Sequence, residues 1–453
     1  MHENKAVFET MPVPRALAKL AVPTIISQLI TMIYNLADTF FIGRTNDPDK
    51  VAAATLAFVL FFLLNAIANL FGVGGGSLIS RLMGRQQHGE VKKVCAVSFY
   101  GTILVSLIYS LCIWLFMDPL LRLMGASDAT IGYASGYLFW AVVVGAVPTT
   151  LSMTLAHLLR SEGYAKQASL GLGMGGVINI VLDPLFMFVL MEPGKEVTGA
   201  AIATMLSNVI TLLYFLVLFL RMRGRSILSL SPRHLPAGLP YLGQVLMVGF
   251  PTALGNLLAS LSNMAVNRLV ANVGDVELAA IGIVKKIDML PLNVGMGLCQ
   301  GMMPLVSYNY ASKNYLRMRS AAHYARMAGL IFAALCVISF ELLADPIVRL
   351  FIDDQQTVEL GRDFLRILCL ATPLMFCNFS FVFTLQAVGK APQSLLVSAC
   401  RQGLIKLPLL FLMARFFGLT GVIWTQFVAD AISLVIAWLV YRHTMQKMQT
   451  SPT

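Results

Sequence analysis

The chain of 453 residues is 57% hydrophobic and only 12% charged, with a formal net charge of +11. So little charge cannot cover the surface of a water-soluble protein of this length, and the basic residues form no clustered face of the kind that binds nucleic acid. We therefore expect an all-α polytopic membrane protein that lies in a lipid bilayer and has no nucleic-acid partner.

Apolar stretches long enough to cross about 30 Å of hydrocarbon recur along the whole chain. They predict about twelve transmembrane helices, at 16–41, 52–76, 94–117, 131–156, 168–191, 199–220, 241–270, 278–306, 321–343, 361–387, 394–414 and 419–441. No short segment with a small-residue cleavage site precedes the first stretch, which is therefore expected to remain as a membrane span.

Lysine and arginine are distributed unevenly between the predicted loops. They gather in the N-terminal stretch and in even-numbered loops, as at 81–93 and 221–233, whereas odd-numbered loops carry acids such as Asp47 and Asp353. Basic loops tend to stay in the cytoplasm. We therefore expect both termini to be cytoplasmic, and this inside bias accounts for most of the net charge.

A carboxylate lies near the end of the first predicted span. Asp38 follows Pro23 by fifteen residues, and Tyr34 and Asn35 precede it at spacings that place all three on one helix face. A charged group at membrane depth costs roughly 2.5–3.5 kcal/mol on insertion scales, so it usually serves ion or proton handling. Pro23 removes one backbone hydrogen bond and bends the helix. The span therefore combines a bend with a titratable group.

The fifth and sixth predicted spans carry further polar residues. Asn179 and Asp183 are four residues apart and share a face, Pro184 follows at once, and Thr204 lies in the sixth span. If these spans pack against the first, an oxygen-rich cluster results. Two carboxylates that share a site favour a proton or a hard cation between them. The alternative is that these polar residues form a hydrogen-bonded cluster that only fixes how the helices pack.

The two halves of the chain match at a nearly constant offset. "LAVP" at 20–23 corresponds to "VGFP" at 248–251, and the later pairs are Asn35 with Asn263, "LIS" with "LVS", Pro148 with Pro373, Gly163 with Gly389 and "TG" with "TG". Each half holds six spans, an even number, so both halves have the same orientation. A pseudo-twofold axis along the membrane normal is therefore expected.

This duplication predicts the domain organisation. We expect an N-terminal six-helix lobe over 1–220, a cytoplasmic linker over 221–240 and a C-terminal six-helix lobe over 241–453. A substrate cavity is expected between the two lobes, as in other transporters built from repeats. The linker contains "SPRHLPAGLP", whose prolines cannot continue a helix for long.

The C-terminal half does not repeat the acidic cluster, because Val266 stands where Asp38 would recur. Its own intramembrane charges are Lys285, Lys286, Asp288, Arg401, Lys406 and Asp430. Four of them are candidates for a cavity that contacts the substrate: Lys285, Asp288, Arg401 and Asp430. Structural ion pairs between these acids and bases are the alternative interpretation.

Arg160 and Glu341 lie near the ends of predicted spans. Long charged side chains at such positions reach the headgroup region, so both are expected at the membrane interface.

Familiar enzyme motifs are missing or misplaced. Gly171, Gly173 and Gly176 spell GxGxxG, but they lie in a membrane span without a preceding strand, and close helix packing explains them better than a dinucleotide. The chain contains no Walker A, HExxH or GxSxG sequence. We therefore expect no enzymatic activity and no cofactor.

Four segments together resemble one transporter family: "LAVPTIISQLITMIYNLADTFFIG", "GGVINIVLDPLFMF", "QGMMPLVSYNYASKN" and "RQGLIKLPLLFLMARFFGLTGV". The chain is similar over nearly its whole length to the multidrug and toxic compound extrusion (MATE) family, and within it to the bacterial MepA-like branch. The resemblance implies a monomeric secondary antiporter of the bacterial cytoplasmic membrane. It would export lipophilic organic cations in exchange for H⁺ or Na⁺ by alternating access.

The resemblance also implies roles for individual residues. Asp38 would be the coupling site and Pro23 the hinge. The supporting ligands would be Tyr34, Asn35, Asn179, Asp183 and Thr204. A bound Na⁺ would be held at Asp38, Asn179 and Asp183. Another branch of the family has an essential acid in the seventh span, and this chain has none within 245–267.

A lipid-linked oligosaccharide flippase of the same superfamily is the alternative function. That cargo would require several basic cavity residues to meet a pyrophosphate, and only Lys285, Lys286, Arg401 and Lys406 qualify. The opposing acids are Asp38, Asp183, Asp288 and Asp430. They favour a cationic cargo.

Overall fold

The computed structural model describes residues 2–45 and 47–450, which form helices and connecting turns with no strand among them. The first half contains α1 (His2–Glu9), α2 (Val13–Gly43), α3 (Pro48–Gly84), α4 (His88–Leu115), α5 (Met117–Leu123), α6 (Ile131–Leu138), η1 (Phe139–Val144), α7 (Ala146–Ser161), α8 (Ala165–Leu185), η2 (Phe186–Leu190) and α9 (Glu196–Arg221). The connection contains η3 (Pro232–His234), α10 (Leu235–Gly238) and η4 (Leu239–Tyr241). The second half contains α11 (Leu242–Ala271), α12 (Asp275–Ala311), α13 (Tyr315–Arg349), α14 (Gln355–Cys369), α15 (Thr372–Ala387), α16 (Ala391–Ala399), η5 (Cys400–Leu404) and α17 (Lys406–Thr450).

Among the described residues, nine helices are long and apolar enough to cross a membrane, and two bent helix pairs raise the number to eleven. The last of these runs, Ala391–Lys447, contains two of the predicted spans, which meet where Gly418 adopts a φ of 58°. Each of the twelve predicted spans therefore has a counterpart. The chain is a multi-pass helical membrane protein.

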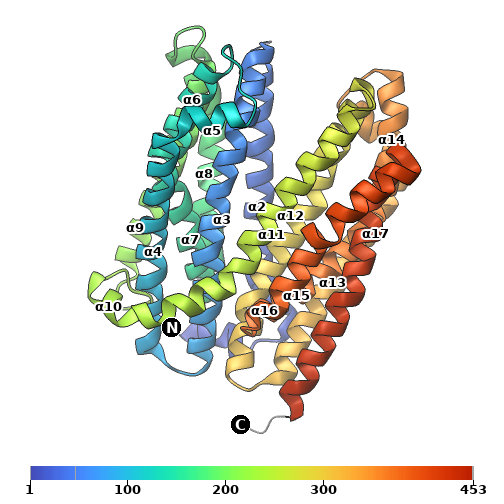
Figure 1. Cartoon of the computed structure of the whole chain (residues 1–453). Coiled ribbons are helices and arrows are strands. Elements are labelled where there is room, and N and C mark those ends of the chain that lie inside the picture. Colours follow the sequence, from blue (N-terminus) through green and yellow to red (C-terminus); the bar gives the residue numbers. More distant parts are fainter. Residues whose placement is uncertain (1, 46, 451–453) are drawn as a thin grey trace.

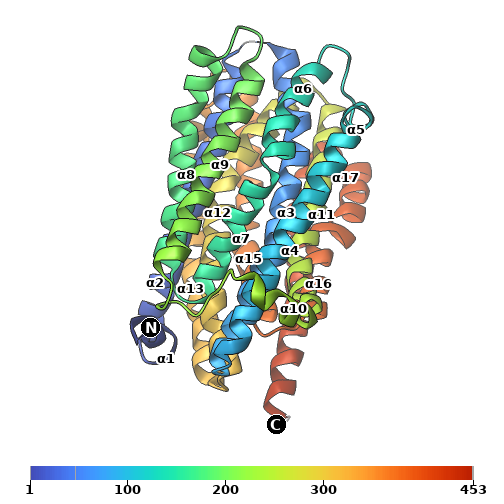
Figure 2. The same cartoon turned by 90° about the vertical axis from the view of Figure 1, so that its left-hand side faces the viewer.

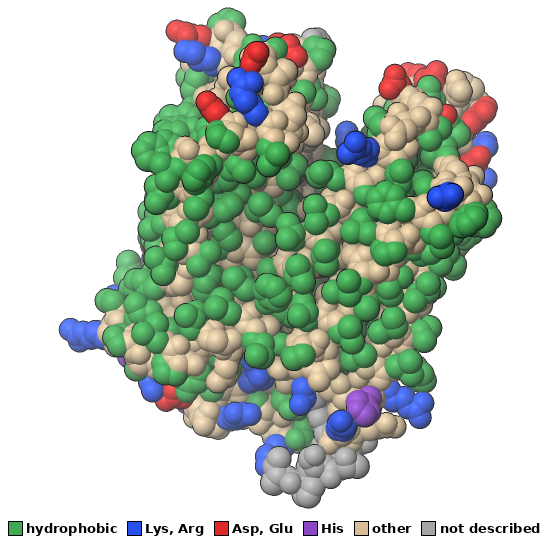
Figure 3. Space-filling model, in the orientation of Figure 1, with side chains coloured by type: hydrophobic (Ala, Val, Ile, Leu, Met, Phe, Trp, Pro, Cys, Tyr) green, Lys and Arg blue, Asp and Glu red, His purple; other side chains and the backbone are tan. Residues whose placement is uncertain are grey.

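The helices divide into two arms (Figure 1). Helices α2–α9 form one arm, here called the N-lobe, and α11–α17 form the other, the C-lobe. Figure 2 shows α8 and α9 side by side on the outer face of the N-lobe. The arms diverge toward one end and leave an open cleft between them, which narrows toward the other end (Figure 3). The closed end carries mainly basic side chains and both chain termini, and the open end carries most of the visible acids.

Glycines bring the lobes into contact near the closed end. A Cβ atom at Gly297 of α12 would lie 2.6 Å from the Ile25 Cα atom of α2, and a Cβ atom at Gly249 of α11 would overlap the Leu70 carbonyl of α3. Gly74, in the "GVGGG" stretch, approaches the backbone of Val245 in the same way. Backbones can approach this closely only where no side chain intervenes.

Residues that match between the halves occupy equivalent places. Pro148 and Pro373 lie in the first turns of α7 and α15, and each of these helices follows a bend, of 49° and 41° respectively. Gly163 follows the C-terminal end of α7 and Gly389 follows the C-terminal end of α15, with φ of 94° and 77° respectively. These positive φ values favour glycine.

The connection between the lobes is held against the N-lobe. Ser226 and the Ile227 N–H both donate hydrogen bonds to the buried Glu162 carboxylate, which follows α7. The Tyr100 hydroxyl of α4 donates to the Leu230 carbonyl at 3.0 Å. The linker is therefore fastened to one lobe as well as joining the two.

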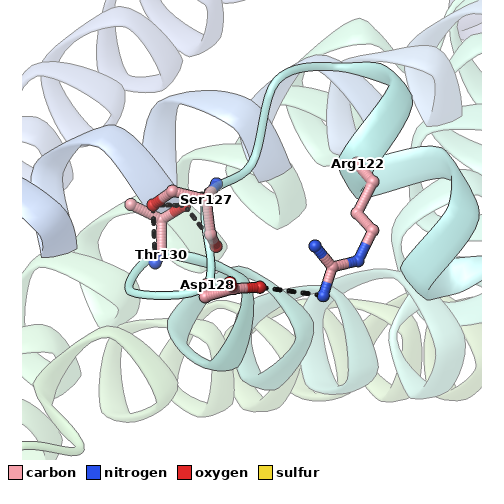
Figure 4. Close-up of polar contacts among 4 residues, drawn as sticks. All are labelled: Arg122, Ser127, Asp128 and Thr130. Carbon is pink, nitrogen blue, oxygen red and sulfur yellow. Dashed lines mark hydrogen bonds and ion pairs between the residues drawn. The ribbon is translucent and has the colours of Figure 1, made fainter.

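A short connection between α5 and α6 lies at the open end of the N-lobe (Figure 1), and Figure 4 shows its polar contacts. Arg122 forms an ion pair with Asp128 at 2.9 Å, and Ser127 and Thr130 exchange hydrogen bonds across one turn. The Asp128 side chain is 90% exposed. Such a surface pair contributes only about 0–1 kcal/mol to the stability of the fold. Substitution of these exposed residues should therefore change stability much less than substitution of buried ones.

Candidate ion and substrate sites

The polar residues of α8 and α9 form a buried hydrogen-bonded group. The Asn179 amide donates to Asp183 Oδ1 at 3.1 Å and to Thr204 Oγ1 at 3.3 Å. All three side chains are buried. The predicted convergence of the fifth and sixth spans is therefore present in the structure.

Helix α2 completes this group with Asp38, which is also buried and lies within electrostatic range of Asp183. Three oxygens of the group are buried without a hydrogen-bond partner among the described residues: Asp38 Oδ1, Asn179 Oδ1 and Asp183 Oδ2. Leaving buried polar atoms unpaired is costly, and such atoms in native structures usually have a reason. Carboxylate and amide oxygens of this kind are able to accept a proton or to coordinate a hard cation.

Two glycines explain why α8 can approach α2 so closely. A Cβ atom at Gly173 would lie 3.0 Å from Ile30 Cδ1, and one at Gly176 would lie 2.9 Å from Ile30 Cγ2 and 3.2 Å from a Tyr34 ring carbon. The GxGxxG stretch is thus a packing surface, as its place in a membrane span indicated.

Aromatic hydroxyls border the acids. Tyr34 lies within electrostatic range of Asp38 and Asp183, and it contacts the Asn35 side chain. Tyr137 of α6 is 1% exposed, lies within range of both acids and contacts Thr204. Tyr137 could not be identified from the sequence, because no spacing along the fourth span relates it to the other polar residues.

Segments of π-helix accompany the polar residues of both lobes. Within the described chain, η1 begins two residues after Tyr137, η2 follows Asp183 and Pro184, and η5 contains Arg401. A π-bulge widens the helix by one residue per turn and occurs often at functional sites. Pro184 lacks an N–H donor, which disturbs the helical bonding beside Asp183.

Pro23 lies inside α2, which is helical from Val13 to Gly43. Side chains near the proline bond back to the helix: Thr24 donates to the Leu20 carbonyl at 2.8 Å, and Ser27 donates to the Thr24 carbonyl at 2.9 Å. Such bonds bend helices slightly and supply alternative partners for backbone carbonyls. The helix is therefore locally adaptable at a place eleven to fifteen residues before Asp38.

The C-lobe contains a different cluster. Arg401 donates to both carboxylate oxygens of Asp430, at 2.6 and 3.4 Å, and Gln426 donates to the same carboxylate at 2.7 Å. Asn378 donates to the Asp430 carbonyl at 3.1 Å, and the Arg401 guanidinium lies 4.7 Å from the Phe379 ring centre. Arg401 and Asp430 are both buried. Their charges are well satisfied, which favours the interpretation as a structural ion pair.

The other C-lobe candidates are placed around this pair. Asp288 and Lys406 lie within electrostatic range of both Arg401 and Asp430. Lys285 instead donates to the Asn267 side chain at 2.7 Å. The structure therefore brings Asp288, Arg401 and Asp430 together and leaves Lys285 at their edge.

The position of Arg160 near the end of a predicted span indicated a place at the membrane interface, but the structure buries this side chain. It is 3% exposed and donates to Ser27 Oγ at 3.3 Å and to Gln300 Oε1 at 3.5 Å. The prediction was wrong because α7 ends where the two lobes meet, so that Ser27 of α2 and Gln300 of α12 contact Arg160 there.

The N-lobe group offers suitable chemistry for H⁺ or Na⁺. Two carboxylates, an amide oxygen, a hydroxyl and phenols are oxygen ligands, which hard cations prefer. In the described residues no group of three or more His, Cys, Asp and Glu side chains could hold a metal ion. A cation here would therefore rely on the neutral oxygens of Asn179 and Thr204 in addition to the carboxylates.

Comparisons with known proteins agree with this architecture. The MatE family profile matches residues 23–185 and again 251–412, so each match begins at the proline inside α2 or α11. The chain is 32% identical over 441 residues to "Multidrug export protein MepA" of Staphylococcus aureus (strain MRSA252), covering 97% of this chain and 95% of that protein. A MepA protein of Staphylococcus saprophyticus is 30% identical over 440 residues, with the same coverage.

Solved structures share the fold. A structure described as "Outward-facing conformation of a multidrug resistance MATE family transporter of the MOP superfamily" superposes with a TM-score of 0.93 at 23% identity, covering 100% of this chain and 99% of the other. "Crystal structure of MATE in the straight conformation" superposes with a TM-score of 0.92 at 23% identity and 100% coverage of both chains. The family profile matches both halves of the chain, and the similarity to the MepA proteins extends over nearly its full length. The chain therefore belongs to the MatE family of multidrug and toxic compound extrusion (MATE) transporters.

Proposed function

We propose that the protein is a multidrug efflux antiporter that exports lipophilic organic cations in exchange for H⁺ or Na⁺. The observation that carries the coupling part of the proposal is the set of three buried, unpaired oxygens on Asp38, Asn179 and Asp183. The export part is supported by the relatives named as multidrug export proteins.

The arrangement of charge supports an orientation in the membrane. The closed end bears the basic side chains and the termini, so it would face the cytoplasm of a bacterial cell, and the open cleft would face outward. The described conformation then corresponds to an outward-open state, from which a cargo leaves and an incoming ion enters.

Ion binding would change the packing of α2. A proton or Na⁺ shared by Asp38 and Asp183 removes the repulsion between two nearby carboxylates and supplies the partner that their oxygens lack. Pro23 and the side-chain bonds that follow it allow α2 to bend in response. Movement of the lobes about their glycine contacts would then close the cleft and open the opposite end.

Acids in both lobes support a cationic cargo. Asp38 and Asp183 lie in the N-lobe and Asp288 lies in the C-lobe, where it is only partly buried and Lys406 is its neighbour. A cargo cation and the coupling ion would compete for negative charge, which is how exchange of one for the other is enforced.

The test is efflux of a fluorescent lipophilic cation from proteoliposomes, driven in turn by an imposed H⁺ gradient and an imposed Na⁺ gradient. Asp38→Asn is compared with Asp128→Asn, which makes the same chemical change at the exposed surface pair. We expect efflux under one gradient for the wild type and for Asp128→Asn, and none for Asp38→Asn. The effective gradient identifies the ion.

Normal gradient-driven efflux by folded Asp38→Asn would overturn the coupling role. If the folded wild type exports no cation under either gradient, the antiporter proposal fails, and translocation of a lipid-linked oligosaccharide becomes the activity to measure.

A further inference from the structure

A small cavity of about 20 Å³ lies between the lobes near the closed end. Its walls come from α3, α7 and α12, so both lobes contribute to it. Its polar lining consists of Ser77, His157, Arg160, Ser161 and Gln300. The volume is enough for one water molecule or one ion of similar size.

Arg160 is the charged group of this cavity. It is 97% buried (3% exposed), and its Nε–H has no hydrogen-bond partner among the described residues. Each of its terminal nitrogens donates one hydrogen bond to a neutral oxygen, Nη1 to Gln300 and Nη2 to Ser27. The described part of the chain places no carboxylate within ion-pair distance of Arg160.

The titratable residues nearest to Arg160 along the chain are Glu162 and His157, and neither supplies its counter-charge. Glu162, two residues on, directs its carboxylate to the linker at Ser226 and Ile227. His157 is the titratable neighbour on the same helix. An arginine cannot lose its proton under ordinary conditions, and a buried charge without a counter-charge is strongly destabilising. The site therefore lacks one negative charge.

We propose that the cavity binds a small monovalent anion, of the size of chloride, as the counter-ion of Arg160. The Arg160 Nε–H supplies a free donor, and Gln300, whose Oε1 already accepts from Arg160, keeps its NH₂ group for donation. Both donors line the cavity that the anion would occupy. Nothing in the proposed coupling site of α2 and α8 is involved.

The position of the cavity gives the anion a second effect. Because Arg160 belongs to the N-lobe and Gln300 to the C-lobe, the bound anion contacts both lobes at the end where they are closed. Separation of the lobes at this end would divide the site. Anion binding therefore stabilises the described conformation, and the stabilisation grows with the anion concentration relative to its dissociation constant.

Two measurements on the purified full chain test the proposal. The first is anomalous diffraction from wild-type crystals grown in bromide, in which a peak beside Arg160 Nε is expected. The second is the thermal unfolding temperature in sodium chloride against sodium gluconate at equal ionic strength. It is measured for the wild type, for Arg160→Gln and for Arg122→Gln, an arginine with a 58% exposed side chain.

We expect chloride to raise the unfolding temperature of the wild type and of Arg122→Gln, and the shift to be lost in Arg160→Gln. Water without a bromide peak in the cavity would overturn the proposal, and so would a chloride shift that persists in Arg160→Gln. If Arg160→Gln does not fold, the bromide density in the wild type decides the question alone.

Discussion

Phe8 of α1 stacks on Tyr308 of α12, with ring centres 4.9 Å apart and planes inclined by 22°. Helix α1 precedes the N-lobe in the chain, yet it docks on the C-lobe. Arg317 donates to the carbonyls of Phe8 and Val7 at 2.7 and 3.0 Å, and the Tyr308 hydroxyl donates to Glu9 at 2.5 Å. The N-terminal helix therefore bridges the two lobes at their closed end.

Removing the Phe8 ring is expected to loosen that bridge. Phe8 is fully buried, and truncation of such a side chain costs about 3–5 kcal/mol. Spin labels at Gln87 and Ser312, which follow α3 and α12, should report a longer and broader distance distribution in Phe8→Ala. The control is Leu316→Ala, an 82% exposed residue nearby. An unchanged distribution in Phe8→Ala would show that α1 does not hold the lobes together.

The Arg401–Asp430 pair is expected to contribute mainly to the stability of the fold and less to transport. Asp430→Asn leaves the Arg401 charge buried without its counter-ion, and breaking a buried pair on one side costs about 3–5 kcal/mol. Thermal unfolding in detergent should show a large loss for this variant. The apolar double variant Arg401→Met with Asp430→Leu should recover much of it.

The exposed pair of Arg349 and Asp345, 2.7 Å apart, provides the comparison, since its loss should cost less than about 1 kcal/mol. If Asp430→Asn unfolds at the wild-type temperature but abolishes efflux, the pair acts on the cargo or the coupling ion instead.

Packing of α8 on α2 is expected to depend on Gly176. A methyl group there would press on Ile30 and Tyr34, and overpacking of this kind typically costs about 1–3 kcal/mol. Gly176→Ala should lower both the unfolding temperature and the rate of dye efflux, because the shift reaches Tyr34 and Asp38. Gly132→Ala, where a Cβ atom meets nothing within 4 Å, should leave both unchanged. Wild-type efflux in Gly176→Ala would mean that the two helices tolerate separation.

The stability of the protein is expected to depend on pH through Glu162, the carboxyl group that binds the linker. Burial raises the pKa of this carboxyl above its ordinary value of 4.5, with opposing hydrogen bonds from Ser226 and Ile227. The folded protein then holds a proton that the unfolded chain releases. Stability from this group is therefore greatest below the unfolded pKa and falls as pH rises through the raised folded value.

Thermal unfolding from about pH 4 to about pH 8 should reveal this slope, and Glu162→Gln should reduce it. Glu192→Gln, at an exposed position where Lys195 lowers the pKa, should retain the contribution of Glu162. An identical pH dependence in the wild type and Glu162→Gln would contradict the prediction.

The membrane spans and part of the N-lobe site could be predicted from the sequence because their signals are local. Hydrophobic runs report spans directly, since hydrocarbon excludes charge over a known thickness. The spacing of Asn179 and Asp183 predicts one helix face, and the structure places both in the group with Asp38 and Thr204. The offset matches pair Pro148 with Pro373, and the structure places a bend before each of the two helices, α7 and α15, that contain them.

Only the tertiary structure decided which distant side chains meet. The burial of Arg160, the place of Tyr137 beside the acids, the choice of Asp430 as the partner of Arg401 and the docking of α1 on α12 depend on how helices far apart in the chain cross. The close approaches of α2 at Gly176 and Gly297 are of the same kind, because backbone geometry rather than hydrophobicity sets the distance between helices there. A linear pattern records hydrophobicity and periodicity, but it carries no direct record of which helix faces which.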